Sequence, residues 1–193
     1  FSIKKKAFIT GTELIDSITQ KFPEMRERNA AFSDFGLRNV LAYRLKNEFA
    51  FNGNLISQKG TLLTMPIVFD NYSETHTQFT LDDIKELANE LNAPLSQQNF
   101  EALLEDSVRI SADEFVSDRS ILFTPRETDT LLEQICTEEY LSVKEITHFD
   151  ILPSCGYNWN GFLLESYLSK YSRKFKLINN SFSTTDYSGA MVK

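Results

Sequence analysis

The chain has 193 residues, of which 41% are hydrophobic and 24% charged, a composition typical of folded globular proteins. No apolar stretch reaches the roughly 18 to 20 residues that a membrane-spanning helix needs, which excludes a transmembrane segment in this sequence. The formal net charge of −7 argues at first against a nucleic-acid partner.

The charge is unevenly distributed along the chain. Residues 1–60 hold ten Lys and Arg against six Asp and Glu, residues 61–125 hold three against twelve, and residues 126–193 hold seven against nine. Because binding follows the local field of a surface and not the sum over the chain, the first third is the best candidate for contact with phosphate. The middle third is the poorest candidate for such contact.

Residues 1–62 predict one small domain. We expect a strand at 6–10, helices at 13–22, 24–31 and 34–46, and a hairpin at 49–57. Thr12 is expected to cap the first helix, and Ser33 or Asp34 the third. Asn-Gly at 52–53 between two apolar stretches is the strongest short-range signal of a hairpin. The expected buried positions are Leu14, Ile15, Ile18 and Phe22 in the first helix and Leu37, Val40, Leu41 and Leu45 in the third.

Residues 63–125 predict an acidic middle unit. A connector without helix is expected over 61–79, followed by a helix that Thr80 caps and a second helix at 96–105. Short strands are expected at 108–111 and 120–123. This unit is interpreted as a helical spacer or as an abbreviated version of the first domain.

Residues 126–193 predict a third domain with a helix around 131–135, a small helix at 143–147 and a long helix within 157–171. A strand at 175–178, a polar loop at 179–188 and a last strand at 189–192 follow. Aromatic residues at helical spacing in the long helix are interpreted as core and not as a platform for stacked bases. Leu14–Ile18 matches Leu131–Ile135 in pattern, and Val40–Leu45 matches Leu163–Leu168, which suggests a structural repeat.

The order of helices, the hairpin letters FNGN at 51–54 and the block NWNGFLLESYLSKYSRKFKLI at 158–178 resemble the tandem winged-helix arrays of bacterial DNA-binding and defence-associated proteins. The resemblance implies a helix-rich α+β fold of winged-helix units, each with a three-helix core and a short β-hairpin wing. It also implies that the third helix of a unit enters the major groove.

Carried over to this chain, the resemblance places base-reading side chains on the outward face of helix 34–46. Arg38 and Asn39 are the residue types best shaped for bidentate contacts with guanine and adenine. The hairpin wing and the basic residues at 26–28 and 170–176 would contact the DNA backbone. The alternative interpretation is that these cations belong to solvated helix faces or compensate helix dipoles. The full set of predicted contacts is Arg26, Arg28, Arg38, Asn39, Tyr43, Lys46, Asn52, Asn54, Lys170, Arg173, Lys174 and Lys176. Lys4, Lys5 and Lys6 are a further candidate as a basic arm.

No catalytic motif, metal-ligand spacing or phosphate-binding loop occurs, so no enzyme activity, cofactor or metal is expected. Cys136 and Cys155 are interpreted as core or near-surface thiols in a reducing cytoplasm, and His76 and His148 as ordinary surface residues. The sequence therefore predicts a non-enzymatic segment of a larger bacterial protein that binds double-stranded DNA mainly through residues 1–62. The alternative is a protein–protein or dimerisation module that uses the acidic middle unit, such as the regulatory part of a multidomain defence protein.

Overall fold

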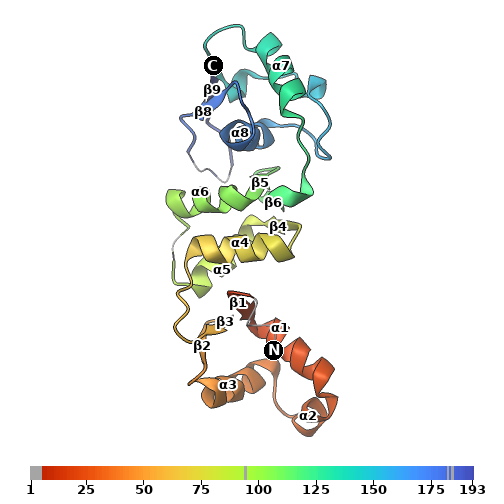
Figure 1. Cartoon of the computed structure of the whole chain (residues 1–193), viewed down its shortest axis with the longest axis vertical. Coiled ribbons are helices and arrows are strands. Elements are labelled where there is room, and N and C mark those ends of the chain that lie inside the picture. Colours follow the sequence, from red (N-terminus) through yellow and green to blue (C-terminus); the bar gives the residue numbers. More distant parts are fainter. Residues whose placement is uncertain (1–5, 94, 182, 184) are drawn as a thin grey trace. The chain divides into compact units, whose positions relative to one another are not determined.

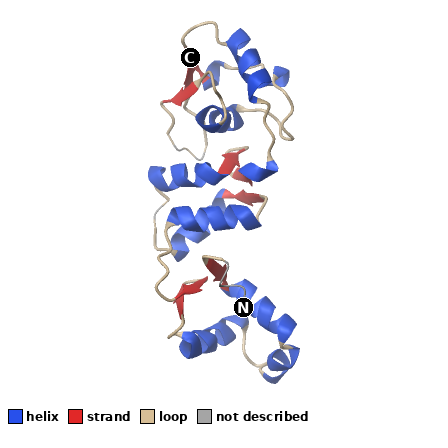
Figure 2. Ribbon diagram, viewed as in Figure 1, coloured by secondary structure: helices blue, strands red, loops and turns tan. Residues whose placement is uncertain are grey.

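The structure, a computed structural model, describes residues 6–93, 95–181, 183 and 185–193. Within these ranges the chain is an α+β protein, as predicted, with helices and three antiparallel three-stranded sheets (Figures 1 and 2). It divides into two compact units. The first takes in the described residues up to Asn71 together with 87–93, and the second takes in Tyr72–Glu86 and the described residues from Leu95 onward. Boundaries at residues 62 and 125 stay a prediction.

The first unit is built on one sheet. Its elements are β1 (Phe8–Thr10), α1 (Gly11–Lys21), α2 (Pro23–Arg28), α3 (Asp34–Leu45), β2 (Phe49–Asn52) and β3 (Leu55–Gln58). The strand order is β1-β3-β2, so the last strand of the hairpin lies in the centre. The predicted hairpin is confirmed, with Asn52 paired to Leu55 and a positive φ of 53° at Gly53. Ile9, Leu14, Ile18 and Ile56 form the core.

Helix α1 begins two residues before its predicted start because Thr10, not Thr12, caps it. The Thr10 hydroxyl accepts a hydrogen bond from the backbone N–H of Glu13 (3.1 Å), and the Glu13 carboxylate accepts one from the N–H of Thr10 (2.7 Å). This reciprocal capping box satisfies two donors at the helix start. The prediction that Phe22 is buried is also wrong: Phe22 links α1 to α2 and is 48% exposed.

The second sheet belongs to the second unit. The sequence did not predict the helix that precedes this sheet. Its elements are α4 (Met65–Thr75), β4 (Gln78–Thr80), α5 (Leu81–Glu90), α6 (Gln97–Asp106), β5 (Ser107–Arg109) and β6 (Glu114–Ser117), with strand order β4-β6-β5. Helices α4 and α5 each contribute residues to both compact units. The middle segment has two helices between its first strand and its hairpin, where the first unit has three, and its second hairpin strand lies at 114–117 instead of 120–123.

Helix α4 was predicted as an extended connector because its first half is rich in residues that favour strands, such as Ile67 and Val68. Pro66 lies in the first turn, where a missing N–H costs no helical hydrogen bond. Tertiary burial then decides the conformation, since Val68 and Phe69 are almost completely buried.

The third sheet follows the same order of elements. Its elements are α7 (Pro125–Ile135), β7 (Tyr140–Ser142), two 3₁₀ turns (Val143–Glu145 and Phe149–Ile151), α8 (Gly161–Lys170), β8 (Lys176–Ile178) and β9 (Ala190–Val192). The strand order is β7-β9-β8. In each of the three sheets a strand leads into helical turns and the last hairpin strand lies in the centre.

Hydroxyl caps mark the same point in all three sheets. Thr10, Thr80 and Ser142 end the first strand of each sheet, and each hydroxyl accepts a backbone N–H from two or three residues further along. The predicted match between 14–18 and 131–135 is therefore wrong, because α1 follows the first strand of its sheet whereas α7 precedes it. The match between α3 and α8 agrees with the topology, since both helices directly precede a hairpin.

One hydrophobic cluster joins the second and third sheets of the second unit. It contains Val108 and Val116 of one hairpin together with Leu132, Leu164 and Tyr167 of α7 and α8. Helix α8 also covers the outer edge of β5, because the Ser166 hydroxyl accepts a hydrogen bond from the N–H of Arg109 (3.0 Å). The interpretation of the aromatic residues of this helix as core is confirmed for Tyr167, which has no exposed surface.

Two buried charges tie the last hairpin to this core. The Arg109 guanidinium donates to the carbonyl oxygens of Ser111 (3.1 Å) and Ser183 (2.6 Å) and lies 4.3 Å from the ring centroid of Phe162. Burial lowers the pKa of Arg109 to about 10, so the side chain stays protonated at neutral pH. The Glu165 carboxylate accepts the N–H groups of Ser188 and Gly189, and burial raises the pKa of Glu165.

Candidate nucleic-acid interface

Helix α3 presents a solvent-exposed face that differs from the predicted one. Phe35 is 69% exposed and Tyr43 is 74% exposed, while Asn39 between them is also exposed. The core side of the helix is set by Leu37, which is buried, and by Leu41, which packs against the core cluster. Val40 was predicted as core and is instead partly exposed, so the helix is rotated relative to the expected orientation.

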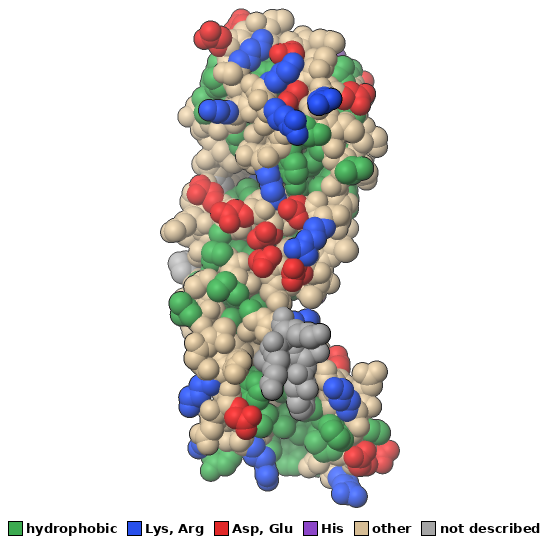
Figure 3. Space-filling model, in the orientation of Figure 1, with side chains coloured by type: hydrophobic (Ala, Val, Ile, Leu, Met, Phe, Trp, Pro, Cys, Tyr) green, Lys and Arg blue, Asp and Glu red, His purple; other side chains and the backbone are tan. Residues whose placement is uncertain are grey.

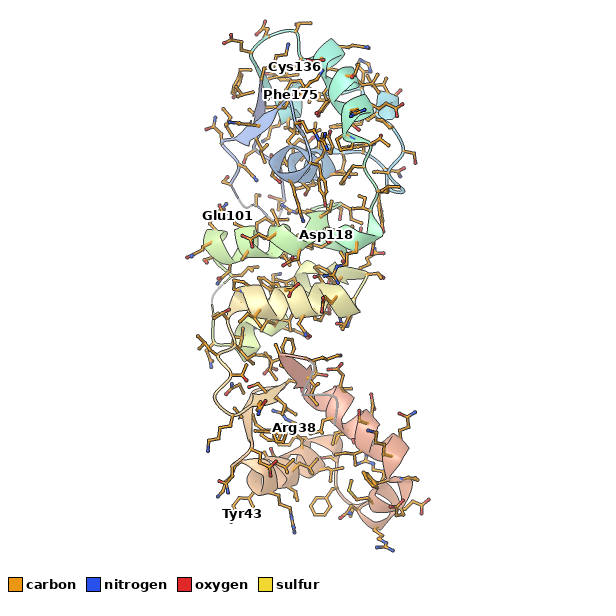
Figure 4. The ribbon with its side chains drawn as sticks, viewed as in Figure 1. Arg38, Tyr43, Glu101, Asp118, Cys136 and Phe175 are labelled. Carbon is orange, nitrogen blue, oxygen red and sulfur yellow. The ribbon has the colours of Figure 1, made fainter. Side chains whose placement is uncertain are left out.

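This rotation turns Arg38 away from the exposed face, contrary to the prediction. Its side chain is half-buried against the start of α1, where a Cβ added to Gly11 would lie 2.9 Å from Arg38 Cδ. Arg38 Nε is buried without a hydrogen-bond partner among the described residues. Figure 4 shows Arg38 on the hairpin side of α3 and Tyr43 projecting outward. Arg38 lines a pocket of about 180 Å³ that also contains Asp16 and Asp34, a lining unsuited to phosphate.

Two cations near α3 are unpaired in the part of the chain that the structure describes. Arg28 at the end of α2 and Arg44 on α3 are exposed, and neither makes a hydrogen bond or ion pair there. The sequence analysis did not select Arg44, because the helix orientation that it predicted placed Arg44 beside the DNA-facing side and not on it. Arg26, which was predicted as a contact, forms an ion pair with Asp34 (2.5 Å) that neutralises the start of α3.

The C-terminal end of α3 carries a preorganised cation. Lys46 Nζ lies 4.6 Å from the centroid of the Tyr43 ring. Counting from Phe35 to Asn47 the sequence contains no acidic residue, which leaves Arg44 and Lys46 as the charges along this helix face. In Figure 3 hydrophobic, basic and acidic side chains are mixed over the part of the chain formed by α1–α3.

The hairpin tip is less available for contacts than predicted. The side-chain and backbone oxygens of Asn54 both accept the N–H of Gly11 (3.1 and 2.8 Å). The N–H of Asn54 donates to the Glu90 carboxylate, which also covers Gly53. Asn54 therefore holds the turn against α1, with a negative charge at the tip. Asn52 is exposed.

The helices that directly precede the other two hairpins do not offer a similar face. Helix α6 carries Glu101, Glu105 and Asp106 and no cation, and Figure 3 shows acidic side chains gathered over this part of the chain. Helix α8 is buried along most of its length.

Half of the predicted basic cluster at the end of α8 is engaged within the second unit. Lys170 forms an ion pair with Asp118 (3.0 Å) and donates to the Glu105 carbonyl at the end of α6, and Lys174 pairs with Glu133 (2.6 Å). Arg173 and Lys176 are exposed. The structure thus places Lys170 and Lys174, two of the four predicted cations of this cluster, in structural pairs, and Lys170 also contacts a helix C-terminus as expected for a helix-dipole cation.

The remaining candidate groups do not assemble a chemical site. Lys6 pairs with Glu13 (3.1 Å), and Lys4 and Lys5 lie outside the described residues. Cys136 and Cys155 are buried free thiols whose pKa values are raised by burial. Across the described ranges no group of His, Cys, Asp and Glu is placed to hold a metal ion, and no helix there is long and apolar enough to cross a membrane.

Comparison of the chain with protein-family models, with curated proteins and with solved structures gives no match.

Proposed function

We propose that the chain is a non-enzymatic, cytoplasmic DNA-binding segment whose three sheets with their helices are winged-helix modules. The repeated strand order and the helix directly before each hairpin support this assignment. The observation that carries the proposal is the α3 face, which exposes Asn39, Tyr43, Arg44 and Lys46 on a helix without acidic residues between 35 and 47.

The first module supplies the contacts in this proposal. Asn39 and its neighbours enter the major groove of duplex DNA, and the cations Arg28, Arg44 and Lys46 contact phosphates. The second module is too acidic along α6 to approach a duplex, and the third has α8 packed inside the second unit. In this proposal these two modules do not contact DNA.

Titration of a labelled duplex at low and moderate salt tests the proposal. Each phosphate contact contributes to a salt-dependent affinity through release of counterions. The double variant Arg44→Ala/Lys46→Ala should bind at least tenfold more weakly than the unmodified chain at low salt. Arg126→Ala/Lys176→Ala removes two exposed cations of the second unit and should leave the affinity unchanged. Absence of salt-sensitive binding, or equal losses in both double variants, contradicts the proposal.

A second candidate function is supported by the exposed aromatic residues. Phe32 and Phe35 are 46% and 69% exposed, and aromatic residues beside arginine are typical of protein–protein interfaces. In that case α3 is a docking surface in a larger assembly or a dimer. Size-exclusion chromatography with light scattering distinguishes the two: a dimer without DNA that Phe35→Ala dissociates supports docking.

A further inference from the structure

The exposed side of α3 carries a stripe of three side chains whose chemistry suits a particular kind of base pair. Phe35, Asn39 and Tyr43 are separated by four residues each and therefore lie on one face of the helix. Phe35 and Tyr43 are 69% and 74% exposed. Asn39 makes no side-chain hydrogen bond within the described residues, so its amide oxygen and nitrogen are both available.

We propose that this stripe reads A·T base pairs in the major groove. The inference rests on the DNA-binding function proposed above and specifies its target. The Asn39 amide is both donor and acceptor and matches N6 and N7 of adenine, while the Phe35 ring matches the 5-methyl group of thymine. These two residues lie in the N-terminal half of α3, the part of a recognition helix that contacts base edges.

The orientation of Arg38 supports A·T over G·C. A guanidinium on the stripe would form the bidentate contact that reads guanine, but the Arg38 side chain lies beside the stripe, half-buried against Gly11. What remains on the stripe is an amide between two aromatic rings. Contact between the Phe35 ring and a thymine methyl group also removes apolar surface from water, which contributes favourable free energy to binding.

The C-terminal end of the stripe fixes the direction of the helix in the groove. Lys46 lies over the Tyr43 ring at 4.6 Å, and Arg44 is adjacent, so positive charge and a phenol hydroxyl gather at this end. Both are phosphate-binding groups. With this end on the backbone, Phe35 and Asn39 are about 6 Å apart along the helix axis, which places the two contacts within about two base-pair steps.

Selection from a random duplex library with the full chain is the first test. The bound pool should be enriched in two A·T pairs within about three consecutive positions. Enrichment in G·C pairs, or retention of duplex without enrichment, overturns the A·T assignment and leaves the proposed DNA-binding function standing. If no duplex is retained at low salt, the A·T assignment and the proposed DNA-binding function are both wrong.

Atom-level replacement in the selected duplex is the second test. Exchanging the contacted thymine for deoxyuridine removes one methyl group and should weaken binding about threefold to fourfold. Exchanging the contacted adenine for 7-deazaadenine removes the N7 acceptor and should weaken binding about tenfold.

Variants assign each effect to its residue. Phe35→Ala should bind the thymine and deoxyuridine duplexes equally, and Asn39→Ala should no longer distinguish adenine from 7-deazaadenine. Val40→Ala, a partly exposed position beside the stripe, is the matched control and should keep both sensitivities. If Phe35→Ala and Asn39→Ala retain the sensitivities of the unmodified chain, another element reads the sequence and the assignment is wrong.

Discussion

At the scale of single residues, one buried carboxylate organises the end of α8. Asp129 on α7 accepts hydrogen bonds from the Tyr167 hydroxyl (2.8 Å), the Ser172 hydroxyl (2.8 Å) and the backbone N–H of Arg173 (2.9 Å). Asp129 is only 2% exposed, and its hydrogen bond with Tyr167 is buried while those with Ser172 and Arg173 are partly buried. A position that looks like an ordinary helix-surface acid in the sequence is therefore part of the core.

We expect Asp129→Ala to lower the free energy of unfolding by about 3 kcal/mol or more, because it leaves three partly or fully buried donors unpaired. Chemical denaturation followed by circular dichroism measures the change. Glu133→Ala on the same helix removes an exposed ion pair with Lys174 and should cost less than about 1 kcal/mol. A similar small cost for Asp129→Ala would show that its hydrogen bonds contribute little.

Burial raises the pKa values of Tyr72, Tyr167 and Tyr171, and these tyrosines make stability sensitive to alkaline pH. Burial, followed by the hydrogen bond to Asp129, raises the pKa of Tyr167, and burial raises the pKa of Tyr171 to about 12. Above pH 10 these tyrosines lose protons in the unfolded chain but keep them in the folded protein. The unfolded state then binds fewer protons, so the free energy of unfolding falls as pH rises.

The expected loss is up to about 1.4 kcal/mol per pH unit for each tyrosine between pH 10 and 12. Denaturation at pH 8, 10 and 11 tests this. Tyr171→Phe should flatten the decline, whereas Tyr43→Phe, an exposed position, should not change its slope. An equal decline in Tyr171→Phe would assign the effect to other groups.

At the scale of elements, α8 is held by contacts on several sides, and its polar residues serve packing. We expect Ser166→Val to lower the free energy of unfolding by about 1 to 3 kcal/mol, because the N–H of Arg109 loses its acceptor in a buried position. Ser169→Ala, an exposed serine on the same helix, should change it by less than about 0.5 kcal/mol. Equal effects of the two substitutions would mean that α8 does not depend on its bond to β5.

Elements with local signals could be predicted from the sequence. The break between α1 and α2 near Pro23, the hairpin at Gly53 and the Thr80 cap each depend on backbone chemistry within a few residues, and the structure has all three. Helix α4 was missed because its conformation depends on burial of Val68 and Phe69, which no local pattern records.

The candidate site was predictable only as a region. Helix α3 and its cation Lys46 were identified from the sequence and Arg44 was not, because the rotation of the helix is set by contacts of Leu37 and Leu41 with the core. Apolar residues occur on more than one side of this helix, so the periodicity did not decide which face is exposed. The orientation of Arg38 follows from Gly11, a residue 27 positions away that leaves room for the side chain.

At the scale of the whole molecule, the net charge of −7 and the local charge of the α3 face lead to different expectations. If the whole chain determined binding, no affinity for DNA would be expected. If the local field determines it, binding depends on Arg28, Arg44 and Lys46, while acidic residues elsewhere keep other surfaces away from the duplex.

The local interpretation predicts a shallow salt dependence. With about three phosphates contacted, a plot of log affinity against log salt concentration should have a slope of about −3, which corresponds to a loss of about 60-fold between 50 and 200 mM salt. Arg44→Ala and Lys46→Ala should each reduce the slope by about 1. Arg173→Ala should not change it, because Arg173 lies in the second unit. A slope near −8 would require many more cations on the DNA than Arg28, Arg44 and Lys46, and binding could then no longer be assigned to α3 alone.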